Sequence, residues 1–73
     1  MELKIYSLDG TQFEGEVSQV SLPTAQGEIT VLKNHLPIIT LLQKGVIKFN
    51  KESISINGGF AEIGKGKVVV LVN

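Results

Sequence analysis

The 73-residue sequence contains no cysteine, which excludes disulfide bonds, thiolate metal sites and a cysteine nucleophile. It also lacks arginine and tryptophan, and seven lysines balance seven acidic residues. Nucleic-acid-binding proteins usually carry a basic excess, with arginine among the contacts. The composition therefore argues against a nucleic-acid partner.

Long apolar runs are absent as well. The longest run, residues 36–42, is broken by Pro37 and Thr40 and falls well short of the roughly 20 residues that a membrane helix needs. The first residues lack the basic start and apolar stretch that are typical of a signal peptide. We therefore expect a soluble chain, which still allows a place on a membrane complex.

The apolar pattern is that of β-strands almost throughout the chain. Apolar and polar residues alternate in residues 1–5 and 53–57, as in strands that bury one face. Turn signals at residues 9–10, 50–52 and 64–67 separate the runs. No segment of ten or more residues shows helical spacing. The sequence predicts a single all-β domain over residues 1–73, a small sandwich or flattened barrel.

Two details of this pattern predict local structure. The apolar side chains of residues 13–22 change parity between Val17 and Val20, so we expect a bulge or bend near Ser18 and Gln19. Ile54 lies on the clearest alternation and is expected to point into the core. We therefore expect Ile54→Asp to unfold the domain.

Two runs, residues 38–42 and 68–72, are apolar at nearly every position. Such strands can bury both faces at the corners of a flattened barrel. Alternatively, their outer faces dock a partner. The pattern alone leaves both interpretations open.

Catalytic and metal-binding constellations are not evident. His35 is the sole histidine and has no carboxylate at metal-ligand spacing, and there is no G-x-S-x-G segment. Glu14 and Glu16 share one face of a predicted strand, where solvation is the simplest interpretation. Residues 64–67, GKGK, lack the spacing and helix of a phosphate loop and predict a turn. We expect neither an enzyme nor a cofactor or metal site.

Several motifs, taken in order, resemble the N-terminal domain of the epsilon subunit of F-type ATP synthases. Residues 27–42, GEITVLKNHLPIITLL, are similar to the family segment G-E-(apolar)-x-(apolar)-L-x-x-H-x-P-(apolar)-(apolar)-T-x-L. Residues 58–63, GGFAEI, look like its G-G-F-x-E-(apolar) signature, and residues 68–71 match its closing strand. The likeness spans nearly the whole chain, and the ordered set is specific.

The resemblance implies a ten-stranded sandwich of two packed sheets in the central stalk of a rotary ATP synthase. There it would be a non-catalytic rotor part that couples the gamma subunit to the membrane c-ring in proton-driven ATP synthesis. Its implied location is peripheral, through the ring, on the cytoplasmic face of the bacterial inner membrane or the equivalent face of an organelle membrane.

The resemblance also implies a c-ring contact. Residue by residue, this contact carries over to Glu28 and His35, with Gln26, Gly27 and Asn34 beside them. We expect a hairpin-like return of the chain to bring the two loops to one end of the sandwich. An anchoring contact with gamma would need a larger apolar surface, and the two strongly apolar runs are candidates.

Longer family members continue past the position of Asn73 into a helical domain, so the inhibitory and nucleotide-binding roles of that domain are not carried over. The alternative function is a generic small β-barrel that binds a ligand or nucleic acid. It would need an exposed aromatic or basic surface, whereas Tyr6, Phe13, Phe49 and Phe60 are expected to pack in the core.

Overall fold

The computed structural model describes residues 1–34 and 37–73, and within them it confirms the all-β prediction. The strands are β1 Glu2–Ser7, β2 Gly10–Glu16, β3 Gln19–Thr24, β4 Gly27–Leu32, β5 Ile38–Leu42, β6 Gly45–Phe49, β7 Glu52–Ile56, β8 Gly59–Gly64 and β9 Lys67–Val72. These are nine strands in the described ranges, not the ten implied by the resemblance. Each run from residue 38 onward forms one unbroken strand between turns, which leaves no tenth strand there. Among residues 1–34 and 37–73, no helix has the length and apolar character that crossing a membrane requires.

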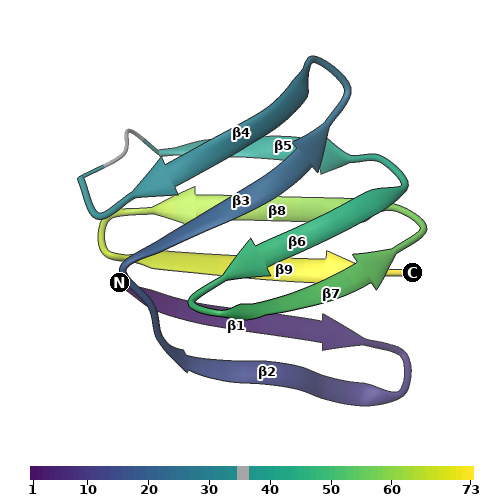
Figure 1. The fold of residues 1–73 in the computed structure, drawn as a ribbon, viewed down its shortest axis with the longest axis horizontal. Helices are drawn as coiled ribbons and strands as arrows, with labels where there is room; N and C mark the ends of the chain where they lie inside the picture. The colour runs from purple at the N-terminus through teal and green to yellow at the C-terminus, as the bar shows by residue number, and fades with distance from the viewer. Residues whose placement is uncertain (35–36) are drawn as a thin grey trace.

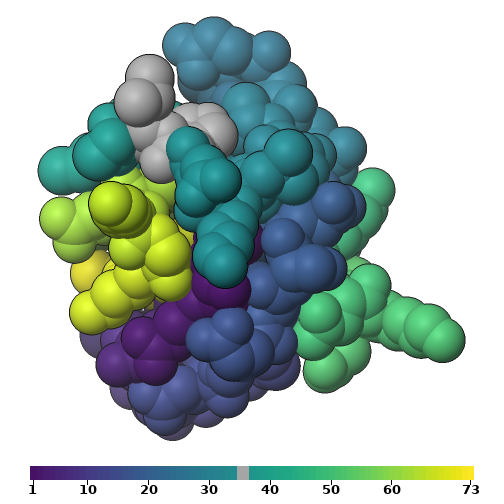
Figure 2. Space-filling view, turned by 90° about the vertical axis from the view of Figure 1, so that its left-hand side faces the viewer, coloured from purple at the N-terminus to yellow at the C-terminus, as the bar shows by residue number. Residues whose placement is uncertain are grey.

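The strands form two layers that meet at one corner (Figure 1). The hydrogen-bonded order is β2-β1-β9-β8-β5-β3-β6-β7, with β4 paired to β3. Strands β5 and β3 share one pair, Thr24 with Leu42, and this pair is the corner. The first layer therefore holds β2, β1, β9, β8 and β5, and the second holds β4, β3, β6 and β7. Figure 2 shows the layers in profile, with the colours of β8 and β9 on the left and those of β3 and β6 on the right.

One apolar core fills the space between the layers. The first layer contributes Leu3, Ile5, Ala61, Ile63, Val68 and Val70, and the second contributes Val20, Leu22, Val31, Ile47, Phe49 and Ile56. Phe13 of β2 meets Phe49 of β6 across the sandwich, with ring centroids 4.3 Å apart. Full burial of one such large apolar side chain stabilises a fold by about 1.5–3 kcal/mol.

The expected bend near Ser18 is confirmed, and the layers explain it. Strand β2 ends at Glu16 in the first layer, and β3 begins at Gln19 in the second. The apolar parity changes because the chain crosses between layers at Val17 and Ser18. A register shift does occur in a ladder, but it lies between Ile5 and Tyr6 in the pairing of β1 with β2.

Ile54 points toward the core as predicted and packs against it. It is only half-buried, however, because β7 is the last strand of the hydrogen-bonded order. Its cross-strand partner on β6, Ile47, is completely buried. The centre of the core therefore lies at β6 and not at β7, the strand that the alternation indicated.

Candidate functional site

The outer face of the second layer is polar. One row of facing residues crosses it from β4 through β3 and β6 to β7, and consists of Thr30, Ser21, Lys48 and Ser53. The hydroxyl groups of Ser21 and Thr30 lie 3.1 Å apart, within hydrogen-bonding distance. This face has the side chains of an ordinary solvated sheet.

The outer face of the first layer is apolar across three strands. Its side chains are Ile39 and Leu41 of β5, Phe60 of β8, and Val69 and Leu71 of β9, and we call this surface the apolar face. Ile39 and Leu41 are 72% and 74% exposed, and Phe60 and Leu71 are each 41% exposed. A contiguous exposed surface of this kind is typical of a protein interface.

The apolar face decides between the two interpretations of the strongly apolar strands. The outer side chains of β5 and of Leu71 remain exposed, so the fold does not bury both faces of these strands. Phe60 is exposed, and Tyr6 stands opposite Leu71 of β9 and is not part of the core, so both correct the expectation that every aromatic residue packs in the core. Phe13 and Phe49 do pack inside, against each other, and are not available to stack on bases.

Strand β8 gives the apolar face a firm base. It pairs along its length with β5 on one side, from Gly59 to Ile63, and with β9 on the other. Beneath it, Ala61 and Ile63 lie in the core. The apolar side chains are therefore presented by a continuous three-stranded sheet and not by loops.

The residues expected at the c-ring contact border one edge strand, β4, which pairs only with β3. Gln26 and Gly27 lie in the β3–β4 hairpin, Glu28 follows at the start of β4, and Asn34 lies just past its end. All four are exposed. His35 lies outside the described residues.

This placement corrects the expected hairpin-like return. Glu28 lies near the start of β4 and Asn34 lies two residues past its end, because the strand runs without a break from Gly27 to Leu32. At the usual rise per residue, Glu28 and Leu32 in the strand are about 13 Å apart, and Asn34 lies in the turn that follows. Glu28 and Asn34 share one edge of the sandwich and not one end of it. We call the exposed border from Gln26 to Asn34 the β4 edge.

Thr24, which the sequence interpretation did not single out, fixes the hairpin at the start of the β4 edge. Its hydroxyl donates a 2.6 Å hydrogen bond to the carbonyl of Gly27 and accepts one of 3.3 Å from the N–H of Gln26. Thr24 is only 5% exposed, and Gly27 takes a positive φ of 110°. A threonine three residues before a turn glycine is the local signal that could have revealed it.

Glu28 has a cationic neighbour, Lys48 of β6, at 3.3 Å. The two side chains reach across β3, since Lys48 pairs with Ser21 while Glu28 pairs with Pro23. Both side chains are more than half exposed, so the pair contributes about 0–1 kcal/mol. No sequence spacing could reveal this partner, because it depends on how β6 pairs with β3.

The remaining chemical candidates have structural roles. Glu14 lies 3.5 Å from the ammonium of Lys4, and Glu16 lies 2.9 Å from the amine of Met1, which agrees with a solvated strand face. Lys65 and Gly66 form the turn between β8 and β9. In residues 1–34 and 37–73, no group of three His, Cys, Asp or Glu side chains is placed to hold a metal ion.

Comparison with known proteins matches this fold along the whole chain. The family model described as the ATP synthase, Delta/Epsilon chain, beta-sandwich domain matches residues 1–73. The ATP synthase epsilon chain of Campylobacter curvus (strain 525.92) is 40% identical over 78 residues, covering 100% of this chain and 60% of that relative. The epsilon chain of Sulfurimonas denitrificans is 42% identical over 77 residues, covering 99% and 59%. The chain thus spans about 60% of the length of these relatives.

Solved structures agree. A chain in the cryo-EM structure of the Euglena gracilis mitochondrial ATP synthase, OSCP/F1/c-ring in rotational state 1, superposes with a TM-score of 0.87 at 26% identity, covering 96% of this chain and 48% of that one. A chain of the Tetrahymena thermophila mitochondrial ATP synthase central stalk/c-ring gives a TM-score of 0.81 at 15% identity, covering 99% and 62%, and supports the fold alone. The family resemblance is confirmed: the chain belongs to the β-sandwich domain family of the ATP synthase delta and epsilon chains.

Proposed function

We propose that this chain is a non-catalytic part of the central stalk of a rotary ATP synthase, where it couples the gamma subunit to the membrane c-ring during proton-driven ATP synthesis. Membership of the family and the likeness to a chain in an assembly of F1 and c-ring support this role. The observation that carries it is the contrast between the apolar face and the polar outer face of the second layer.

The apolar face is the anchoring surface in this proposal, and gamma is its partner. Ile39 and Leu41 expose most of their side chains on β5, and Leu71 extends the surface on β9. Covering an apolar surface is favourable by about 25 cal/mol for each Å² removed from water. Binding of a protein partner that covers all three strands is therefore favoured by the burial of apolar surface alone.

The β4 edge is the c-ring contact in this proposal. Gln26, Glu28 and Asn34 are exposed polar residues along it, and His35 is assigned to the same contact from the resemblance. Exposed polar and charged pairs are individually weak, at about 0–1 kcal/mol. They would orient the domain on the polar loops of the ring while the apolar face holds gamma. The chain would lie peripherally, through the ring, on the cytoplasmic face of a bacterial membrane or its organelle equivalent.

Co-purification with the gamma subunit from the same source tests the anchor. We expect stoichiometric binding by the unaltered chain and loss of binding by the double variant Ile39→Ser/Leu41→Ser. Both side chains are exposed, so the double variant should keep its fold. Leu32→Ser is the matched control, because Leu32 is a 55% exposed leucine on β4, away from the apolar face. Equal binding by the double variant would refute the assignment of the face, and no binding by the unaltered chain would refute the role.

Cross-linking tests the β4 edge. The chain has no native cysteine, so Glu28→Cys and Asn34→Cys each introduce a unique thiol. In the assembled enzyme we expect both to cross-link to cysteines placed in the polar loops of the c-ring. Ser53→Cys, exposed on β7, should not. Cross-linking from Ser53→Cys alone would place the ring against a different edge.

A further inference from the structure

A row of large apolar side chains crosses four neighbouring strands of the first layer (Figure 1). Leu41 of β5 stands opposite Phe60 of β8, which stands opposite Leu71 of β9. Leu71 in turn stands opposite Tyr6 of β1. The next residue in line, Thr11 of β2, is polar. We call the four large side chains the leucine–aromatic row, and it extends the apolar face onto β1.

The leucine–aromatic row lies on the outer side of the layer, where a partner can reach it. Leu41, Phe60 and Leu71 are exposed, and Tyr6 is half-buried. Large aromatic side chains carry much of the binding energy in protein interfaces, and tyrosine is among the commonest of them. Tyr6 is therefore a candidate contact that lies outside the three strands of the apolar face.

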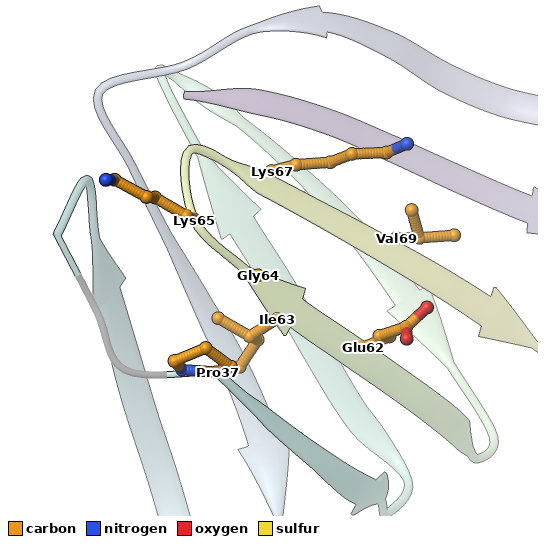
Figure 3. Close-up of a pocket in the computed structure, with 7 residues that line it drawn as sticks. All are labelled: Pro37, Glu62, Ile63, Gly64, Lys65, Lys67 and Val69. Carbon is orange, nitrogen blue, oxygen red and sulfur yellow. The ribbon is translucent and has the colours of Figure 1, made fainter.

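The row beside it, two residues further along each strand, is mixed. It runs from Ile39 through Glu62 and Val69 to Lys4, so that apolar and charged side chains alternate. Figure 3 shows the Glu62 carboxylate beside Val69, with the Lys67 ammonium on the other side of Val69. A hollow of about 360 Å³ beside Glu62 is lined by this carboxylate and by two lysines. The continuously apolar surface is therefore a band one side chain wide and four strands long.

The shape of this band and the pairing beneath it favour a helix as the covering element. Strands β8, β9 and β1 each pair with a strand on both sides. An extended segment laid over them would bury its own N–H and C=O groups without partners. A second sheet would cover a broad face several rows deep. An α-helix satisfies its backbone internally and presents a narrow apolar stripe.

The dimensions of the row fit a short helix. Neighbouring strands lie about 4.8 Å apart, so a row across four strands spans about 14 Å. An α-helix covers this distance in about nine residues, or roughly two and a half turns. A helix with its side chains is about 10 Å wide, and successive rows on a strand are about 7 Å apart. One flank of the helix therefore reaches the mixed row.

We propose that the partner contacts the apolar face with an amphipathic α-helix that lies across β5, β8, β9 and β1 along the leucine–aromatic row, with Tyr6 as the contact at its far end. The inference rests on the proposed function, because it names the kind of element with which gamma contacts this chain. Apolar side chains at helical spacing face the row, as in other helices that dock by one stripe. Polar side chains on the flank face Glu62 and Lys4, which remain at the polar rim.

Binding of the chain to the gamma subunit from the same source tests the contact at Tyr6. We expect Tyr6→Ser to raise the Kd by about tenfold or more, because a large ring leaves the interface. Tyr6→Phe keeps the ring and should stay within about threefold of the unaltered chain. Thr11→Ala, next in line on β2, is the matched control and should change the Kd by less than about twofold. Unchanged binding by Tyr6→Ser would overturn the inference.

Photo-cross-linking tests the helix, and it does not depend on how well Tyr6→Ser folds. A short diazirine-bearing residue is placed at position 41, 71 or 6, one at a time, and the linked residues of gamma are identified by mass spectrometry. We expect the sites reached from positions 41 and 6 to lie about nine residues apart in one segment, with the site from position 71 between them. The same residue at position 32, on β4, should not link to that segment.

Other patterns of cross-links would overturn the helix. An extended segment would place the sites from positions 41 and 6 only about four residues apart, because a strand rises about 3.3 Å per residue. A sheet or a set of loops would place them on separate segments of gamma.

The outcomes also separate this inference from the proposed function. If Ile39→Ser/Leu41→Ser loses binding but the cross-links fall on separate segments, the helix is overturned and the proposed anchor stays intact. Failure of the unaltered chain to bind gamma would overturn both.

Discussion

Gly59 of β8 lies so close to Leu71 of β9 that a β-carbon at Gly59 would overlap the carbonyl oxygen of Leu71. It would also lie 2.9 Å from the Cα of Val72, and the φ of Gly59 is 147°, which other residues rarely adopt. The close approach brings β8, the central strand of the apolar face, against β9 at the end where Phe60 and Leu71 pair. Glycine at position 59 therefore leaves room for the backbone of β9 beside one end of the proposed interface.

We expect Gly59→Ala to lower the free energy of unfolding by about 2–4 kcal/mol, because backbone must move on both strands. Gly66→Ala is the control. Gly66 has a positive φ of 71° but nothing within 4 Å of an added β-carbon, so only backbone strain of about 1–2 kcal/mol is expected. Urea unfolding followed by far-UV circular dichroism measures both. Equal losses would show that the close approach to Leu71 has no consequence.

Ile47 and Ile54, which pair across β6 and β7, should differ in their effect on stability. Ile47 is completely buried, so Ile47→Ala is expected to cost about 2–5 kcal/mol. Ile54 is half-buried, and Ile54→Ala should cost about half as much because less surface is lost. Denaturant titrations of both variants check the order. A larger loss at Ile54 would contradict the placement of the core centre on β6.

The pair formed by Glu28 and Lys48 should be weak and sensitive to salt. A double-mutant cycle with Glu28→Gln and Lys48→Gln is expected to give a coupling of about 0.2–1 kcal/mol at low ionic strength, since both side chains are exposed. At 1 M salt, where the Debye length is about 3 Å, the coupling should be close to zero. A coupling that persists at high salt would indicate a more buried contact than the 3.3 Å pair described here.

The exposed leucine of β5 should make the isolated chain prone to self-association. We expect Leu41→Lys to reduce association at high protein concentration, as measured by analytical ultracentrifugation. Its free energy of unfolding should change by less than about 0.5 kcal/mol, because Leu41 is 74% exposed. Leu32→Lys, on β4, is the control and should leave association unchanged. If the unaltered chain and Leu41→Lys self-associate to the same degree, the apolar face does not mediate self-association.

Local features of this fold could be predicted from the sequence because they depend on neighbouring residues. The alternation around Ile54 identified an inward-facing strand, and the parity change between Val17 and Val20 identified the bend. The GKGK segment was correctly interpreted as a turn, in which Gly66 takes a positive φ. In each case the signal lies within a few residues of the structure that it predicts.

Long-range pairings could not be predicted in the same way. The ion pair of Glu28 with Lys48 depends on β6 lying beside β3, and the corner depends on a single pair, Thr24 with Leu42. The expected return placed the loops of Glu28 and His35 at one end of the sandwich; His35 lies outside the described residues, and Asn34 beside it lies past the far end of β4 from Glu28. The family motifs identified the relevant segments but not the distance between them.

The parallel pairing of β1 with β9 joins the first strand of the described chain to the last, with Leu3 opposite Val68. Contacts between such distant residues close a loop of almost the whole chain, which slows folding because the loop entropy is lost before most native contacts form. During synthesis, the hairpin of β1 and β2 has no partner on its second side until β9 has left the ribosome. The domain is therefore expected to fold late and all at once, and an unfinished chain would expose an unpaired strand edge to aggregation.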